Sequence, residues 1–195
     1  MGIFKGFGLI DIFFLILWLR ITYEAASKGL FIEILKILAL FINSVFTFQF
    51  YPFIAEKLTN KVSFLGKDLT NGITAIVLFV ILAIVVGLII KIIDALFKRK
   101  EIAFAEKIAA IILGFVRVLF LTSVLVFFLH LFSAQAGFFG GYTSQLLKGI
   151  APKTYLATAK GIGKVFPGFV ANAEVEKFLA GTLEKTDSRE GNKKN

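Results

Sequence analysis

The stretch ITAIVLFVILAIVVGLII, from Ile73 to Ile90, decides the fold class of this chain. No charged residue occurs between Leu69 and Ile90, and Lys91 and Asp94 follow directly. The many β-branched residues are compatible with a strand, but an uncharged run of this length favours a helix that crosses about 30 Å of hydrocarbon. The stretch therefore predicts a membrane-spanning helix.

The composition of the whole chain points to lipid as its surrounding solvent. Hydrophobic residues make up 57% and charged residues 18% of the 195 residues, whereas a soluble domain has about 45–50% and about 25%. A globule of this size lacks the interior volume to bury so much apolar surface. We therefore predict an all-α integral membrane protein. The net charge of +9 then indicates the lipid bilayer, with its anionic headgroups, as partner, and not nucleic acid.

Few side chains of this sequence are suited to catalysis or metal binding. The chain has no Cys and one His, which excludes disulfides and thiolate sites and leaves too few ligands for a typical zinc site. The glycines of AKGIGKVFPG, residues 159–168, lack the spacing of a phosphate-binding loop. We predict no enzyme, no catalytic residues, no metal and no cofactor.

A second apolar stretch, Ile108–Phe132, contains Arg117 in its interior. An arginine at the centre of a span costs about 2.5–3.5 kcal/mol on the insertion scale, and each Leu, Ile, Phe or Val returns about 0.3–0.6 kcal/mol. Eighteen such residues occupy the stretch. Its insertion is therefore predicted despite the charge.

Two further spans are predicted earlier in the chain, over residues 8–27 and 29–51, with Pro52 after the second. The very short turn between them favours antiparallel neighbours. Polar residues of the second span share one helical face, which should point to protein or water and not to lipid. They are Glu33, Lys36, Asn43 and Thr47. The prediction is thus four transmembrane helices in a membrane domain of residues 1–133.

The remainder of the chain is more polar. Residues 134–184 are predicted to form a Gly-rich loop and an amphipathic helical segment, and residues 185–195 a disordered polar tail. Within the segment, a helix over 152–166 carries lysines that could lie on a lipid surface. They are Lys153, Lys160 and Lys164. The alternative is a solvated helix that packs on the bundle. A further short helix is expected over 172–183, with Asn172 as its N-cap.

Glu33 and Arg117 are the leading candidate functional residues, because intramembrane charges usually pair and face the bundle interior. They could be charged elements of a conduction or coupling path, or a structural clamp between helices. Glu106 is a second candidate partner for Arg117, since eleven residues place both on one helical face. Gly114 would allow close helix approach beside Arg117. Asp11 is either an anchor at the end of the first helix or a proton- or cation-binding carboxylate.

The order of these features resembles the colicin V production protein family of bacterial inner-membrane proteins. The resemblance covers about residues 10–132 and opens with IDIFFLILWLRITYEAASKGLFIEILKILALF, in which Asp11 begins the first helix and Gly29 precedes Glu33. The first-helix end of the family often reads G-x-x-x-G, so the resemblance implies helix packing at Gly29, although here Ala25 takes the place of the first glycine.

The resemblance continues through the long apolar stretch TAIVLFVILAIVVGLIIKIID and ends in EKIAAIILGFVRVLFLTSVLVFF, whose G-x-x-R core is Gly114 and Arg117. The family often has Arg before the Glu and Gly after the Arg, where this chain has Ile32 and Val118. The residues after Phe132 are not part of the resemblance.

The resemblance implies a multi-pass protein of the bacterial plasma (inner) membrane. Its expected role is to support production or export of the peptide toxin colicin V and envelope homeostasis, through other membrane proteins or a homo-oligomer. Two alternatives rest on the residues themselves. One is a small channel or transporter with Asp11, Glu33 and Arg117 along a charged path. The other is a lipid-surface organiser that uses the basic C-terminal segment.

Overall fold

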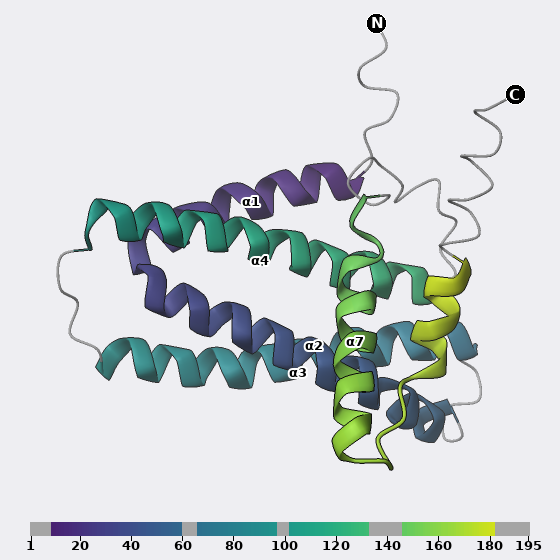
Figure 1. The fold of residues 1–195 in the computed structure, drawn as a ribbon. Coiled ribbons are helices and arrows are strands. Elements are labelled where there is room, and N and C mark those ends of the chain that lie inside the picture. Colours follow the sequence, from purple (N-terminus) through teal and green to yellow (C-terminus); the bar gives the residue numbers. More distant parts are fainter. Residues whose placement is uncertain (1–8, 60–65, 97–101, 133–145, 182–195) are drawn as a thin grey trace, which may run out of the picture.

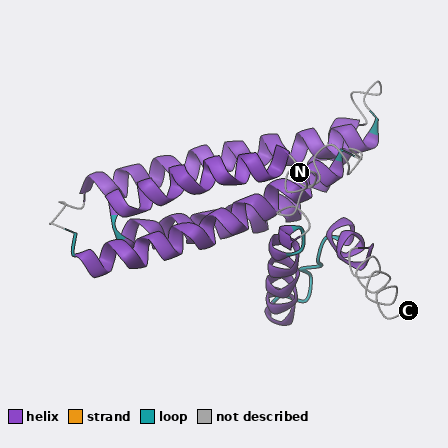
Figure 2. Cartoon of the chain, turned by 90° about the horizontal axis from the view of Figure 1, so that it is seen from above, coloured by secondary structure: helices purple, strands orange, loops and turns teal. Residues whose placement is uncertain are grey.

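The computed structural model describes residues 9–59, 66–96, 102–132 and 146–181, and all regular structure in these ranges is helical (Figures 1 and 2). A short helix over 173–181 follows the last named element. The named helices are α1 (Leu9–Lys28), α2 (Leu30–Thr59), α3 (Lys67–Leu96), α4 (Phe104–Leu131) and α7 (Ile150–Val165). The predicted Gly-rich loop over 134–145 and the predicted tail over 185–195 lie outside the described residues.

Four helices form an antiparallel bundle, and α7 crosses it near one end (Figure 1). α1 packs along α4, α2 packs along α3, and α2 also contacts α4. This order places α1 and α3 on opposite flanks, with α2 and α4 between them.

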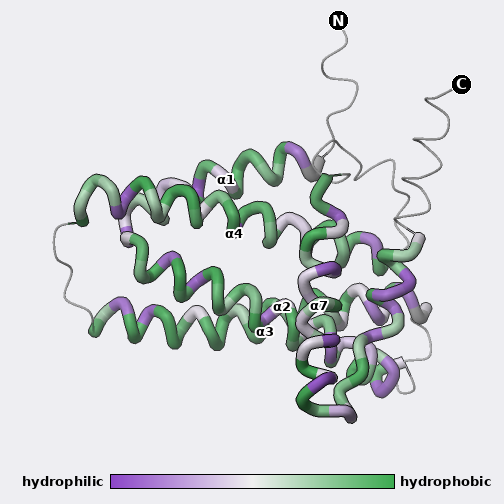
Figure 3. Tube along the Cα trace, viewed as in Figure 1, coloured by the Kyte–Doolittle hydropathy of each residue, from purple (hydrophilic) through white to green (hydrophobic). Residues whose placement is uncertain are grey.

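Three of the four bundle helices are long and apolar enough to cross a membrane: α2, α3 and α4. Length and composition thus support three of the four predicted spans. α1 has 20 residues but carries Asp11, Arg20 and Glu24, so its length and composition alone do not mark it as a span. Apolar side chains of α3, such as Ile81 and Ile84, are exposed, so lipid would contact them. The trace of α3 is mostly hydrophobic along its length (Figure 3).

Gly29 forms the turn between α1 and α2. Its φ of +83° lies in the left-handed region, where a side chain would be strained. Its N–H donates to the Ala25 carbonyl over 3.2 Å. A Cβ at Gly29 would also lie 2.9 Å from Glu106 Oε1, so that flexible carboxylate would have to shift, but it is the backbone conformation that favours glycine. One residue therefore reverses the chain between α1 and α2.

α2 continues through Pro52 to Thr59. The predicted end of this helix, directly before the proline, is therefore wrong. A proline inside a helix leaves the carbonyl four residues earlier without its usual donor. Here that carbonyl belongs to Phe48, and Asn172 Nδ2 donates to it over 2.7 Å. A side chain from the C-terminal segment thus supplies the missing hydrogen bond, and the helix is not interrupted.

The C-terminal segment packs on the bundle through an aromatic core at the junction of α2, α4 and α7. The Phe48 and Phe127 ring centroids are 4.7 Å apart, and Tyr155 meets Phe48 edge-on at 5.5 Å. Its fully or nearly fully buried members include Phe48, Tyr51, Phe127, Phe128, Tyr155 and Val175. The predicted N-cap is confirmed, since Asn172 Oδ1 accepts from the Glu174 N–H over 2.9 Å.

Candidate functional site

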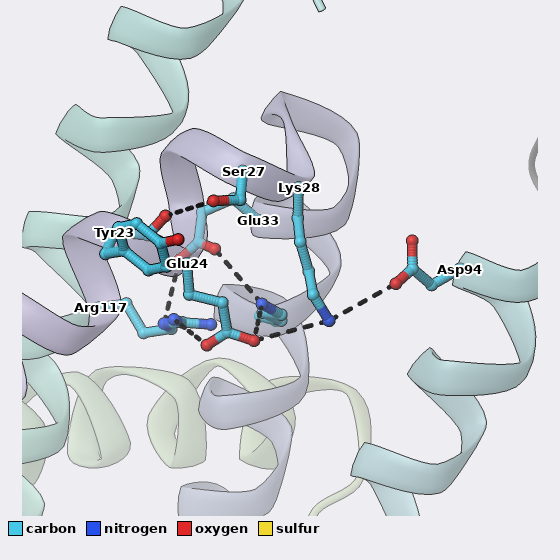
Figure 4. Close-up of polar contacts among 8 residues, drawn as sticks. Tyr23, Glu24, Ser27, Lys28, Glu33, Asp94 and Arg117 are labelled. Carbon is cyan, nitrogen blue, oxygen red and sulfur yellow. Dashed lines mark hydrogen bonds and ion pairs between the residues drawn. The ribbon is translucent and has the colours of Figure 1, made fainter. Parts of the chain in front are cut away.

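A cluster of six charged side chains joins the bundle helices beside the α1–α2 turn (Figure 4). We call it the charged cluster. Glu24 and Lys28 come from α1, and Glu33 and Lys36 from α2, while Asp94 and Arg117 come from α3 and α4.

Arg117 occupies the centre of the charged cluster. Its Nε lies 3.0 Å from Glu33 Oε1, and its Nη2 lies 3.6 Å from Glu24 Oε2. Glu33 is fully buried, and Arg117 is 8% exposed. The Glu33 contact is an ion pair whose angles fall outside hydrogen-bond geometry. The structure thus brings together the two residues that the sequence singled out.

The two lysines extend the charged cluster to α3. Lys36 Nζ lies 2.8 Å from Glu24 Oε1 and 3.9 Å from Glu33 Oε2. Lys28 Nζ lies 3.6 Å from Glu24 Oε1 and 3.4 Å from Asp94 Oδ2. Glu24 therefore contacts three cations, and the ion pairs link all four bundle helices.

Local sequence explains how these side chains converge. Glu24 and Lys28 are four residues apart on α1, and Glu33 and Lys36 are three apart on α2, so each pair shares a helical face. Gly114 lies one turn before Arg117 and lets α1 approach α4 closely. A Cβ at Gly114 would lie 3.0 Å from the Ala25 Cβ.

Glu106 does not pair with Arg117, contrary to the second candidate pairing from sequence. Its Oε1 instead accepts the Leu30 N–H over 3.2 Å, at the start of α2. Eleven residues place Glu106 and Arg117 on one face of α4, but they are separated by about 16 Å along the helix axis. Glu106 thus caps the α1–α2 turn, and Glu24 and Lys36, which the sequence did not single out as partners, surround Arg117. The signal for Glu24 was its spacing of four residues from both Arg20 and Lys28 on α1, and the signal for Lys36 was its place on the polar face of the second span.

Asp11 lies apart from the charged cluster. It is buried, in the first turn of α1, and thirteen residues separate it from Glu24, about 20 Å along the helix. The structure therefore does not bring Asp11 together with Glu33 and Arg117. The predicted inward orientation of the α2 polar stripe is confirmed for Asn43 and Thr47, which are buried.

A groove of about 330 Å³ opens beside the charged cluster, between α1 and α3. Its floor is α2 and α4, from which Lys36, Asn43 and Arg117 contribute. Asn43 Nδ2 donates to the Phe79 carbonyl over 3.2 Å and so ties the floor to the α3 wall. Apart from its charged groups, the groove is lined mainly by aliphatic side chains.

The predicted lipid-surface lysines lie on the exposed face of α7. Lys153, Lys160 and Lys164 are exposed, and the opposite face, which includes Ala151 and Tyr155, is buried against the bundle. At 100° per residue the three lysines fall within a narrow stripe. The predicted amphipathic helix is therefore present, with its apolar face used for packing.

Hydrogen bonds hold α7 in place. The Ala151 N–H donates to Ser123 Oγ over 2.8 Å, and Tyr155 Oη donates to Gln49 Oε1 over 2.6 Å. The same hydroxyl accepts the Asn172 N–H over 2.9 Å. Burial raises the pKa of Tyr155 above its usual value of 10.0, because a phenolate there would lose its hydration.

Within the described residues, no group of three or more His, Cys, Asp or Glu side chains is placed to hold a metal ion. The charged cluster contains carboxylates and fixed cations without a hydroxyl or thiol nucleophile among its six members. Its arrangement is suited to holding helices together and to presenting positive charge at the groove.

The comparisons with known proteins identify a family. A family model described as colicin V production protein matches residues 10–151. The match begins in α1, includes all six residues of the charged cluster, and extends past Phe132, where the resemblance in the sequence ended, to the start of α7. No curated protein and no solved structure gives a significant match. Because the family model covers well over half of the chain, this membrane protein belongs to the colicin V production protein family.

Proposed function

We propose that this chain is a non-enzymatic, four-span protein of the bacterial inner membrane that supports colicin V production or export and envelope homeostasis through partner proteins. The observation that carries the proposal is the family match over residues 10–151, because that range contains the whole bundle and its charged cluster. The apolar outer surface of the bundle supports residence in lipid.

The fourth span in this proposal is α1. Its 20 residues extend about 30 Å, which is enough to cross the hydrocarbon. Two of its charges, Glu24 and Lys28, form ion pairs with residues of the neighbouring bundle helices, which reduces the cost of placing them in the membrane. Reporter fusions before α1 and after α4 test the topology. Four spans place both reporters on one side of the membrane, whereas three spans place them on opposite sides.

The charged cluster acts in this proposal as a clamp. Glu33 is fully buried and the paired charges face one another, so the arrangement favours helix association over an ion path. The distance of Asp11 from the cluster argues in the same direction. Reconstitution in liposomes tests the channel alternative, and a solute flux above that of protein-free liposomes would favour it.

A secretion assay tests the toxin role. The host would carry the colicin V genes and lack its own family member, and toxin in the medium would be measured. We expect this chain to restore release, and Glu33→Leu to lower it. If the cluster is a clamp, Glu33→Leu with Arg117→Met restores release, because no buried charge is left without a partner. Continued loss in a double variant of normal abundance would indicate that the charges act directly.

Contact of α7 with the membrane surface is a second candidate function. The helix crosses the bundle (Figure 1), so it lies roughly parallel to the bilayer plane when the bundle spans, with its lysine stripe away from the bundle. Because the chain has no Cys, Lys160→Cys can carry a single fluorophore. Quenching by brominated phosphatidylglycerol supports the contact, and a fluorophore that only aqueous quenchers reach contradicts it.

A further inference from the structure

We propose that the groove between α1 and α3 is a binding site for an anionic phospholipid. The phosphate would lie beside the charged cluster, and an acyl chain would lie along the aliphatic walls. The proposal goes beyond the toxin role and rests only on the proposed placement of the four helices in the bilayer. It concerns a surface separate from the lysines of α7.

The first argument is the charge of the groove. Three cations line it, and Glu24 is the one carboxylate among its lining residues. Glu33 lies beneath, fully buried, and contacts both Lys36 and Arg117. Counting Glu33, cations still exceed carboxylates by one. The cations are Arg20, Lys36 and Arg117. Aliphatic walls of low dielectric strengthen the resulting positive potential.

Arg20 is the accessible donor for a phosphate. It is exposed, and it makes no ion pair with any residue that the structure describes. Lys36 and Arg117 are mostly buried and already paired with carboxylates, so they contribute charge more than direct contacts. A phosphate beside Arg20 would receive charge-assisted hydrogen bonds, for which the planar guanidinium is well suited.

The second argument is depth in the membrane. Lys28 contacts Asp94 over 3.4 Å, which sets the α1–α2 turn level with the end of α3. Asp94 is four residues past Ile90, where the uncharged run of α3 ends, and Ile90 lines the groove. The charged part of the groove therefore lies about one helical turn from the level where hydrocarbon meets headgroups. Snorkelling of the Arg20 side chain and local thinning of the bilayer would bring a lipid phosphate to that level.

The third argument is the open space along α3. A Cβ at Gly87, which lines the groove, would have no heavy atom of another group within 4 Å. Ala83 and Val86 line the same wall. The volume of about 330 Å³ is within the usual range for ligand sites. The walls can accept the upper part of an acyl chain without rearrangement.

Native mass spectrometry tests the proposal. The full chain in detergent is mixed with equal amounts of phosphatidylglycerol and phosphatidylethanolamine, and the amounts of the two lipids bound are compared. We expect preferential binding of phosphatidylglycerol, and about a fivefold loss of affinity in Arg20→Gln, as for the removal of one membrane-facing cation. Lys160→Gln removes an exposed cation from α7 and should leave this binding unchanged. Equal binding of the two lipids, or equal losses in the two variants, would overturn the proposal.

A second pair of variants tests the apolar part of the groove. Gly87→Phe fills open space and should lower phosphatidylglycerol binding severalfold without loss of thermal stability. Gly161→Phe is the matched control, because a Cβ at Gly161 on α7 also meets open space. Unchanged binding in Gly87→Phe contradicts the proposal. Glycerol phosphate, which lacks acyl chains, should not compete at equal concentration, and effective competition would contradict the acyl-chain contact.

A crosslinking experiment in native membranes addresses a competing occupant of the groove. The variant Gly87→Cys introduces one cysteine into a chain that has none. We expect it to remain monomeric under mild oxidation, because lipid fills the groove. A disulfide-linked dimer would assign the groove to a second copy of the chain and overturn the proposal.

Discussion

The two ends of the bundle hold α2 and α4 together by different means. At the α1–α2 turn, Glu33 and Arg117 meet as buried charges, whereas at the α7 end Phe48 and Phe127 meet as rings, 4.7 Å between centroids. A buried charge is costly without its partner, but a buried ring contributes burial of its own. The charged end should therefore depend on complete pairs, and the aromatic end on each side chain separately.

The largest expected effect is at the charged end. Glu33→Leu leaves Arg117 without its closest carboxylate and should lower the free energy of unfolding by about 3–5 kcal/mol. Thermal unfolding in detergent measures this loss. The double variant Glu33→Leu, Arg117→Met should regain most of it. A double variant as unstable as the single one would show that the ion pair itself stabilises the bundle.

The aromatic end should respond without such recovery. Phe127→Ala removes a fully buried ring that contacts Phe48 and Phe178 and should cost about 3–5 kcal/mol. Adding Phe48→Ala should lower stability further, as the same unfolding measurement would reveal. Recovery in that double variant would erase the difference between the two ends.

The packing beneath the charged cluster gives a smaller effect. Gly114→Leu places a side chain where a Cβ already lies 3.0 Å from Ala25, so α1 must move away from α4. We expect a loss of about 1–3 kcal/mol in the unfolding measurement. Gly87→Leu is the control, because its Cβ meets open space. Equal stability of the two variants would mean that close approach of α1 is unimportant.

Removal of one hydroxyl at the aromatic end should lower the free energy of unfolding by a smaller amount. Tyr155→Phe leaves Gln49 Oε1 and the Asn172 N–H without their partner, at about 1 kcal/mol. Hydrogen exchange over residues 166–181 measures the loosening. Tyr23→Phe alters an exposed tyrosine and should change nothing. Unchanged exchange in Tyr155→Phe would separate this hydroxyl from the docking of the segment.

The same tyrosine makes stability depend on pH at the alkaline end. Because its pKa is raised in the folded protein, its contribution is complete below about pH 10, the pKa of a tyrosine in the unfolded chain. This contribution to stability decreases at higher pH, because the tyrosine of the unfolded chain releases its proton first. The loss of stability with rising pH should therefore be smaller in Tyr155→Phe.

The smallest expected effect is at the partly exposed edge of the charged cluster. Lys28→Gln removes the contacts with Glu24 and Asp94, and we expect a loss of at most about 1 kcal/mol because both contacts are near solvent. Added salt should narrow the difference from the unaltered protein. A loss as large as that of Glu33→Leu would show that the link to α3 belongs to the buried part of the cluster.

Much of the fold is predictable because the signals are local. The uncharged run before Lys91 is long enough to span, and the glycine at position 29 marks the turn between two helices. The Glu33–Arg117 pairing could be anticipated, since a buried charge requires an opposite one nearby. The choice between Glu106 and Glu24 as further partners could not, because it depends on the height at which α1 packs along α4.

By itself, the sequence determined that lipid surrounds this protein, where the main helices lie, and which charged side chains need an oppositely charged partner. These features follow from apolar length and helical periodicity, which act within one segment. Only the tertiary structure decided which charges meet, where the groove opens, and that α2 passes through Pro52. The hydrogen bond that permits this passage comes from Asn172, 124 positions after Phe48. No local pattern encodes such a contact, since it exists only once the C-terminal segment packs on the bundle.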